Sequence, residues 1–154
     1  MEKIASFTVD HRYINEGVYI SRIDGDITTY DLRMIKPNTG DLMENDAIHS
    51  FEHMLATFAR NSEIKDDIVY VGPMGCQTGF YLLVRNADNK KVIEIIKKLL
   101  ADICVYEGEI FGKSEIECGN YKNLSLDAAK MEALKYFEKI KDITETDLIY
   151  PEGE

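Results

Sequence analysis

The sequence predicts an α+β fold in which an antiparallel β-sheet packs against α-helices. Strand-like segments occur in pairs that are joined by short turns or glycine-rich stretches, which is typical of antiparallel pairing. Longer segments with apolar residues at helical spacing lie between and after these pairs. The chain lacks the repeated strand–helix–strand units that indicate a parallel sheet. These observations together favour α+β over α/β.

The first strand pair lies within residues 17–35, where apolar and polar residues alternate on both sides of the turn Asp24-Gly25-Asp26. A loop that contains proline and glycine then leads to the first helix. Asn45 or Asp46 can cap this helix, which we expect to continue to about Asn61.

The second strand pair consists of residues 67–71 and 80–85, which the glycine-rich segment 72–79 separates. Apolar residues at helical spacing over 92–104 predict the second long helix. A third helix is predicted over residues 125–141, with a serine at its start and alanine, leucine and phenylalanine on one side.

Composition and length restrict the class of protein. The chain has 154 residues, and we expect residues 1–154 to form one domain in which the acidic tail 144–154 frays. A net charge of −10 argues against a nucleic-acid partner or an anionic membrane surface. The longest apolar runs are far shorter than the ~20 residues of a membrane span. Without a signal-peptide pattern, the 3 cysteines favour reduced thiols in the cytoplasm.

The most informative segment is His49-Ser50-Phe51-Glu52-His53, on the first predicted helix. At about 100° per residue, both histidines and Glu52 share one side, and the apolar residues occupy the opposite side. Side chains at i and i+4 are neighbours, so both imidazoles can reach one metal ion. A pair of surface histidines is the simpler interpretation, but the shared side favours metal binding. The order His-x-x-Glu-His is the inverted zinc motif, which also occurs in metallopeptidases.

Two histidines leave a catalytic metal site incomplete, because such sites usually have three protein ligands. His11 lies far upstream, which makes the cysteines the other candidates. Cys104 lies on the apolar side of its helix, which is typical of a buried core cysteine. Cys118 lies in a polar loop where a packing role is less natural. Cys76 lies between glycines that let a ligand approach the thiol, although a tight turn alone would also explain this segment.

Several segments, in matching order and spacing over nearly the whole chain, resemble motifs of the S-ribosylhomocysteine lyase family, LuxS. They are Ser6-Phe7-x-x-Asp10-His11, Tyr30-Asp31-Leu32-Arg33 with Lys36-Pro37-Asn38, His49-x-x-Glu52-His53, Pro73-Met74-Gly75-Cys76-Gln77-Thr78-Gly79 and Glu117-Cys118-Gly119. One departure is Phe111-Gly112, which stands where the family often has Ile-Pro. The path of that loop is therefore less closely defined by the resemblance.

The resemblance implies cleavage of the thioether of S-ribosylhomocysteine to homocysteine and 4,5-dihydroxy-2,3-pentanedione, the precursor of autoinducer-2. The carbonyl migrates along the opened ribose from C1 to C3, and the thiolate then leaves by β-elimination. One divalent metal per chain, on His49, His53 and Cys118, polarises the carbonyl. Fe(II) is the implied native metal, Zn(II) or Co(II) can substitute, and no organic cofactor is used. Glu52 moves protons at C3 and C4, and Cys76 moves those at C1 and C2.

The resemblance also implies that Ser6, His11 and Arg33 line the substrate pocket. Arg33 can hold a polar or carboxylate group of the substrate, whereas on its position alone it would be a surface cation at a strand end. A homodimer with active sites at its interface is implied as well.

Two other functions fit the helical motif. A small inverted-motif metallopeptidase would use Glu52 as the base for a metal-bound water and a distant glutamate as third ligand, and Cys76 would be dispensable. A binding module with a structural metal site would use four protein ligands. The sequence favours the lyase, because it offers three ligands together with an additional acid and an additional thiol.

Overall fold

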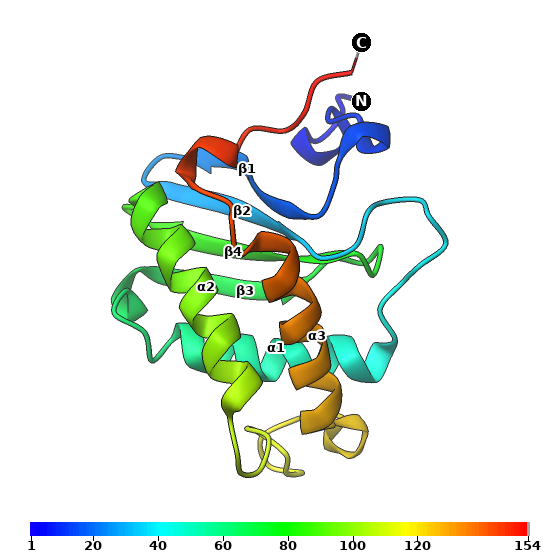
Figure 1. Cartoon of the computed structure of the whole chain (residues 1–154), viewed down its shortest axis with the longest axis vertical. Helices are drawn as coiled ribbons and strands as arrows, with labels where there is room; N and C mark the ends of the chain where they lie inside the picture. The colour runs from blue at the N-terminus through cyan, green and yellow to red at the C-terminus, as the bar shows by residue number, and fades with distance from the viewer. Residues whose placement is uncertain (154) are drawn as a thin grey trace.

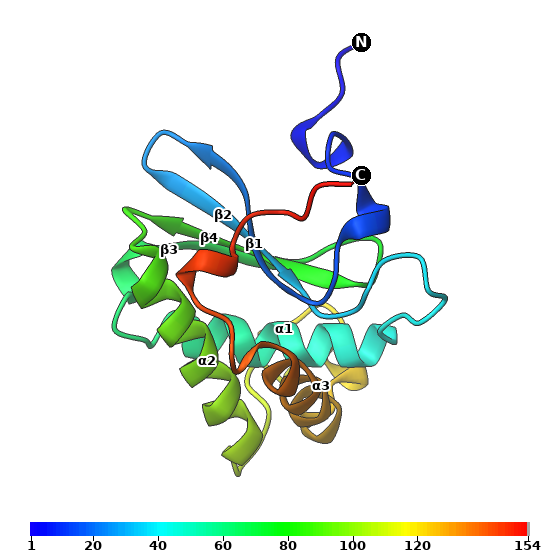
Figure 2. The ribbon, with the colours of Figure 1, turned by 45° about the horizontal axis from the view of Figure 1, so that its top comes forward.

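The computed structural model describes residues 1–153 and has one four-stranded sheet in the order β1-β2-β4-β3. All neighbouring strands are antiparallel. The main elements, in chain order, are β1 (Gly17–Asp24), β2 (Ile27–Arg33), α1 (Asn45–Ala59), β3 (Ile68–Pro73), β4 (Gly79–Arg85), α2 (Asn89–Val105) and α3 (Leu126–Ile140). The helices lie together on one face of the sheet (Figures 1 and 2). The predicted α+β class is confirmed.

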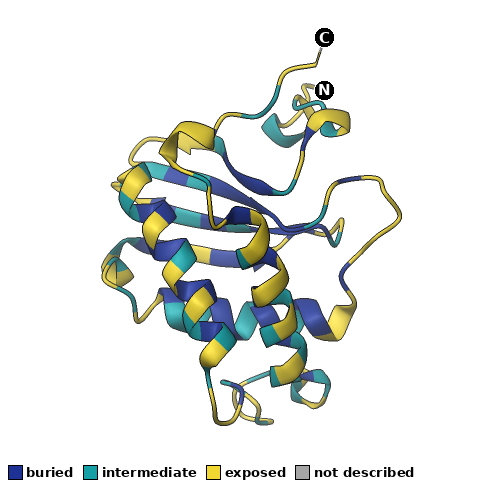
Figure 3. Ribbon diagram, in the orientation of Figure 1, coloured by how far each residue is buried: buried dark blue, intermediate teal, exposed yellow. Residues whose placement is uncertain are grey.

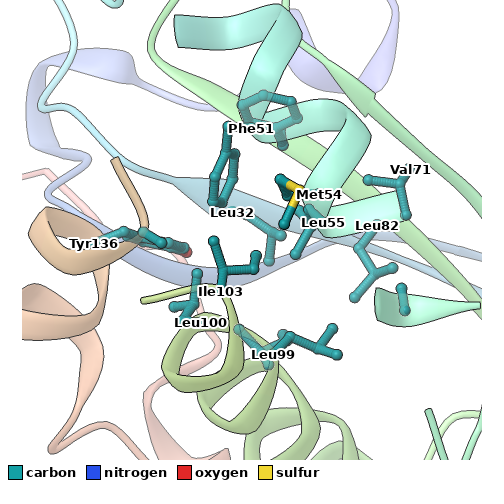
Figure 4. Close-up of a cluster of buried hydrophobic side chains, with 14 of the residues drawn as sticks. Leu32, Phe51, Met54, Leu55, Val71, Leu82, Leu99, Leu100, Ile103 and Tyr136 are labelled. Carbon is teal, nitrogen blue, oxygen red and sulfur yellow. The ribbon is translucent and has the colours of Figure 1, made fainter. Parts of the chain in front are cut away.

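The core fills the space between the sheet and the helices (Figure 4). Phe51, Met54 and Leu55 of α1 are almost completely buried, and they lie near Leu32 and Leu82 from the sheet. The remaining core is supplied largely by the inner sides of α2 and α3, whose outer sides are exposed (Figure 3). The predicted apolar side of α1 therefore faces the core, and its histidine side faces away from the sheet.

Pairing of β2 with β4 sets the position of the glycine-rich segment between β3 and β4. Arg33 pairs with Gly79 at the end of the two strands. A side chain at Gly79 would place its Cβ 2.5 Å from the Leu32 carbonyl oxygen, so only glycine permits this approach. The end of β2 is thereby held against the segment that carries Cys76.

Helix boundaries agree with the sequence except at the starts of α1 and α2; α2 begins at Asn89, three residues before the predicted 92–104. The N-cap of α1 is Glu44, whose side chain makes no capping hydrogen bond, so the predicted caps Asn45 and Asp46 are wrong by one or two positions. The carbonyl of Glu44 already accepts the first helical hydrogen bond, from Ile48. The predicted start of the third helix is confirmed, because Ser125 accepts from the Ala128 amide.

The C-terminal segment is docked, and the expectation of a frayed tail is wrong for residues 144–150. Thr144 and Asp147 form a capping box at the short 3₁₀ helix Glu145–Asp147. Leu148 is 1% exposed, and its carbonyl accepts a hydrogen bond of 2.8 Å from the Ile20 amide. Burial of one leucine and an added backbone hydrogen bond to β1 stabilise the docked segment, although the segment is acidic. In Figure 2 this segment crosses beside β1 toward the N-terminal residues.

No helix among residues 1–153 is both long enough and apolar enough to cross a bilayer.

Candidate active site

The inverted motif and Cys118 form one cluster. His49 and His53 lie one turn apart on α1, and their ring centroids are 4.6 Å apart. Cys118 comes from the irregular segment between α2 and α3, and its Sγ lies 3.3 Å from His49 Nε2. One ligand atom from each of the three residues lies within 4.8 Å of the others. Two imidazole nitrogens and one thiolate at this spacing are a suitable ligand set for Zn(II) or Fe(II).

Each histidine is oriented through its other ring nitrogen. His49 Nδ1 lies 2.5 Å from Asn123 Oδ1, and His53 Nδ1 lies 2.8 Å from the Phe111 carbonyl oxygen. Because both partners are acceptors, each Nδ1 carries the proton and donates, which leaves each Nε2 lone pair for a metal ion. Asn123 is itself held, since its Nδ2 donates to Asn45 Oδ1 at 2.8 Å. The structure therefore has a candidate metal site whose two histidines are already oriented by neighbouring residues.

Gly112 explains the departure from the family at the loop beside His53. Its φ of 74° lies in the left-handed region, where glycine is favoured. A Cβ at this position would lie 2.8 Å from His53 Nδ1, too close for ordinary packing. Glycine therefore lets the Phe111 carbonyl reach the histidine.

Glu52 is half-buried and lies on α1 between the two histidines, as the helical spacing predicts. Cys104 is not part of this cluster. Its thiol is half-buried at the edge of the core, not fully buried as predicted, and burial raises its pKa.

Cys76 lies in a different place, at a cleft of about 300 Å³ between the end of β2 and the loop that follows it. The cleft is lined by His11, Arg33, Pro37, Asn38, Gly40, Leu42, Cys76 and Thr78. Cys76 is exposed, and its Sγ lies 3.0 Å from the Thr78 hydroxyl oxygen. The neighbouring Gln77 has a φ of 65°, so the backbone turns sharply just after the thiol. An exposed thiol with small neighbours is accessible to a substrate.

Arg33 is buried beside this thiol, and the interpretation as a surface cation is wrong. Its side chain is 3% exposed and is paired with Asp31, which is 1% exposed. Nε and Nη2 donate to the two carboxylate oxygens at 3.1 and 2.7 Å. Nη1 donates to the Thr78 hydroxyl at 2.9 Å and lies 3.9 Å from Cys76 Sγ. Burial is the largest single effect and lowers the pKa of Arg33, but the charge and hydrogen bonds of Asp31 together with other nearby groups outweigh burial, so the pKa is raised.

The N-terminal candidates lie in different surroundings. His11 lines the cleft, and its Nδ1 is 2.9 Å from the Val9 carbonyl oxygen. Ser6 lies on the short 3₁₀ helix Ala5–Phe7, is half-exposed and does not line the cleft. This N-terminal segment extends away from the sheet (Figure 2). The metal cluster and the Cys76 cleft share no residue.

The sequence profile of the S-ribosylhomocysteinase (LuxS) family matches residues 4–147. The chain belongs to the LuxS family. An S-ribosylhomocysteine lyase of Borrelia garinii subsp. bavariensis is 46% identical over 157 residues, which cover 98% of this chain and 100% of that protein. The lyase of Finegoldia magna is 43% identical, with 99% of this chain and 100% of that protein covered. The lyase of Clostridium beijerinckii is 44% identical, with 98% and 99% covered.

Membership of the LuxS family confirms the resemblance seen in the sequence. The relatives are named S-ribosylhomocysteine lyases, and the histidine–cysteine cluster is compatible with a metal site in such an enzyme. The LuxS motifs led to the cluster and to Cys76, but they gave no positioning role to Asp31 and did not include Asn123. Asn123 has no local signal, because its partner His49 is 74 positions away. Asp31 did have a local signal, because residues at i and i+2 on a strand share a face, which places Asp31 on the same face as Arg33.

Proposed function

We propose that this chain cleaves the thioether of S-ribosylhomocysteine, releasing homocysteine and 4,5-dihydroxy-2,3-pentanedione. The observation that carries the proposal is the convergence of His49, His53 and Cys118 with their orienting partners, in a LuxS chain that retains an accessible Cys76. The inverted-motif peptidase is not favoured, because the third member of the cluster is a cysteine and not a distant glutamate. A closed structural site is not favoured, because only three residues form the cluster within residues 1–153.

His49, His53 and Cys118 would hold one divalent ion, which we propose to be Fe(II) in the cell. The same two-nitrogen, one-sulfur set accepts Zn(II) or Co(II), and affinity alone favours zinc over iron. A bound ion supplies Lewis-acid polarisation of the sugar carbonyl oxygen.

Cys76 is proposed to move protons at C1 and C2 as the carbonyl migrates. Proton transfer at these carbons requires a thiolate that can accept a proton from one carbon and return it to the next. The Arg33 guanidinium faces the sulfur at 3.9 Å, and the Thr78 hydroxyl lies 3.0 Å away. A positive charge close to the sulfur stabilises the negative charge that the sulfur carries during proton transfer.

Glu52 is proposed to act at C3 and C4, from its position on the histidine side of α1. In the final step, Glu52 removes the C4 proton, which is acidic because C3 is by then a carbonyl. The electron pair forms the C4–C5 double bond while the C5–sulfur bond breaks, and homocysteine leaves as its thiolate. The enol product then tautomerises, so the reaction needs no external oxidant or reductant.

His11, Arg33 and Ser6 are proposed to contact the substrate. Asp31 occupies the Nε edge of Arg33, so the Nη1 side, which faces the cleft, is the part available to a ligand. Ser6 lies outside this cleft. The separation of the cleft from the metal cluster supports a homodimer whose active sites combine residues of both chains. Exposed apolar side chains on the extended N-terminal segment, such as Phe7 at 68% exposure, also favour such an assembly.

The test is incubation of the metal-loaded protein with S-ribosylhomocysteine and a thiol reagent that reports released homocysteine. Cys76→Ala and Glu52→Gln should keep the metal and the fold but lose at least about 10²–10⁴-fold in rate. Proton NMR in D₂O should separate them, because Glu52→Gln alone can retain exchange at C2. Cys104→Ala is the matched control and should remain active. Normal homocysteine release by Cys76→Ala would contradict the assignment of the thiol, and amide hydrolysis without thioether cleavage would instead support the peptidase.

A further inference from the structure

The docked C-terminal segment brings an aromatic hydroxyl to the buried ion pair. Tyr150 stacks on Tyr19 of β1, with ring centroids 4.9 Å apart and an interplanar angle of 19°. Its hydroxyl donates to Asp31 Oδ2 at 2.7 Å. The segment is anchored just before this contact, where Leu148 is buried and its carbonyl accepts from the Ile20 amide.

Asp31 Oδ2 is the point where the C-terminal segment meets the Cys76 cleft. The same oxygen that accepts from Tyr150 also accepts from Arg33 Nη2, both at 2.7 Å. The other end of the guanidinium contacts Thr78 and faces Cys76 Sγ. A continuous series of polar contacts therefore runs from Tyr150 to Cys76.

Tyr150 is suited to be a donor throughout the working pH range. Burial, and next the negative charge of Asp31, raise the pKa of Tyr150 well above its ordinary value. The hydroxyl therefore stays protonated and shares the carboxylate charge with Arg33. Without that donor, the full negative charge of Asp31 would act on the guanidinium, and less positive potential would reach the sulfur.

We infer that Tyr150 is a positioning residue of the active site: through Asp31 it orients Arg33 and preserves the positive charge that activates the Cys76 thiol. The effect of Tyr150 on catalysis rests on the proposed function, whereas its effect on the reactivity of the Cys76 thiol does not. It assigns a role to a residue beyond the part of the chain that the LuxS profile matches, residues 4–147.

The test is the rate at which Cys76 is alkylated in the full-length protein, resolved by mass spectrometry of the Cys76 peptide. Tyr150→Phe keeps the ring that stacks on Tyr19 and removes only the donor. We expect alkylation by neutral iodoacetamide near neutral pH to slow by about three- to tenfold, because the thiolate is the reactive form. Alkylation by anionic iodoacetate should slow more, since it also senses the lost positive potential. Tyr70→Phe, at a tyrosine that is 52% exposed on the edge strand β3, is the matched control and should leave both rates unchanged.

The two reagents separate positioning from a purely structural role. Equal slowing with both reagents, or no slowing in a folded Tyr150→Phe protein, would overturn the inference. The inference would be supported if Tyr150→Phe slowed alkylation by iodoacetate more than alkylation by iodoacetamide. A several-fold lower kcat with a nearly unchanged KM for S-ribosylhomocysteine should accompany this difference. If the unaltered protein did not cleave S-ribosylhomocysteine, the proposed function would fail, and the alkylation rates would still decide the role of Tyr150.

Discussion

Replacing Asp31 by valine should destabilise the fold more than any surface substitution, because it leaves the buried charge of Arg33 without its partner. Arg33 and Asp31 are 3% and 1% exposed, so neither can turn to solvent without local unfolding. The substitution removes both acceptors of the Nε and Nη2 bonds and leaves a buried guanidinium without its counter-charge, with the Thr78 hydroxyl as its remaining oxygen acceptor. Removing one partner of a buried ion pair costs about 3–5 kcal/mol. Domains of this size are stable by only about 5–15 kcal/mol, so the loss is a large fraction of the total.

The assay is urea unfolding followed by circular dichroism. Protein concentration and metal content must be equal for all variants, because assembly and bound ions both change apparent stability. With a slope of about 2 kcal/mol/M, the expected loss moves the midpoint down by about 1.5–2.5 M. The double variant Asp31→Val with Arg33→Met removes both charges and should recover most of this loss, because apolar replacement of a whole buried pair is often neutral.

A matched control tests whether burial is the cause. Arg22 and Asp24 also lie two residues apart on a strand and form a close two-bond contact, but their side chains are 53% and 52% exposed. Asp24→Val should cost less than about 1 kcal/mol. If Asp31→Val cost no more than Asp24→Val, or if the double variant were less stable than Asp31→Val alone, the reasoning from desolvation would be refuted.

Two further predictions concern the metal cluster and pH. Gly112→Ala should weaken metal binding by about 10–100-fold, because its Cβ would displace His53. Competition with a chelator measures this affinity. Gly119→Ala is the control and should bind metal like the parent, because a Cβ at that position meets nothing within 4 Å. Burial raises the pKa of Glu132 above its ordinary 4.5, so its ionisation destabilises the folded chain as pH rises through that value. Glu132→Gln should therefore unfold at higher urea than the parent at about pH 7 and lose this advantage below about pH 4; an unchanged difference across that range would contradict the burial argument.

Local patterns were sufficient for most of the elements and for the two histidines of the candidate metal cluster. The hairpin was predictable because Asp24-Gly25-Asp26 separates two alternating segments, and Gly25 adopts the φ of 61° that the turn requires. His49 and His53 were predictable because four residues on a helix bring two side chains together. In each case the signal lies within a few residues of the feature.

Features that depend on contacts distant in sequence could not be predicted. Leu148 is one apolar residue in an acidic segment, and only its pairing with Ile20 shows that the segment is docked. Arg33 was open to two interpretations, since burial of a strand end depends on the loop that folds over it. Phe111 supports His53 through its carbonyl oxygen, a contact that depends on backbone path and not on residue type.

The buried pair also bears on how function is built into this sheet. Asp31 and Arg33 lie in the middle of the sheet order, on β2, where two apolar residues would pack without the cost of desolvating charges. Stability alone therefore does not explain why the pair is present. Its geometry does, because Asp31 and Thr78 fix the guanidinium so that Nη1 faces Cys76. On this argument the double variant Asp31→Val with Arg33→Met should keep the fold and lose the reactivity of the thiol, which separates the contribution of the pair to catalysis from its contribution to stability.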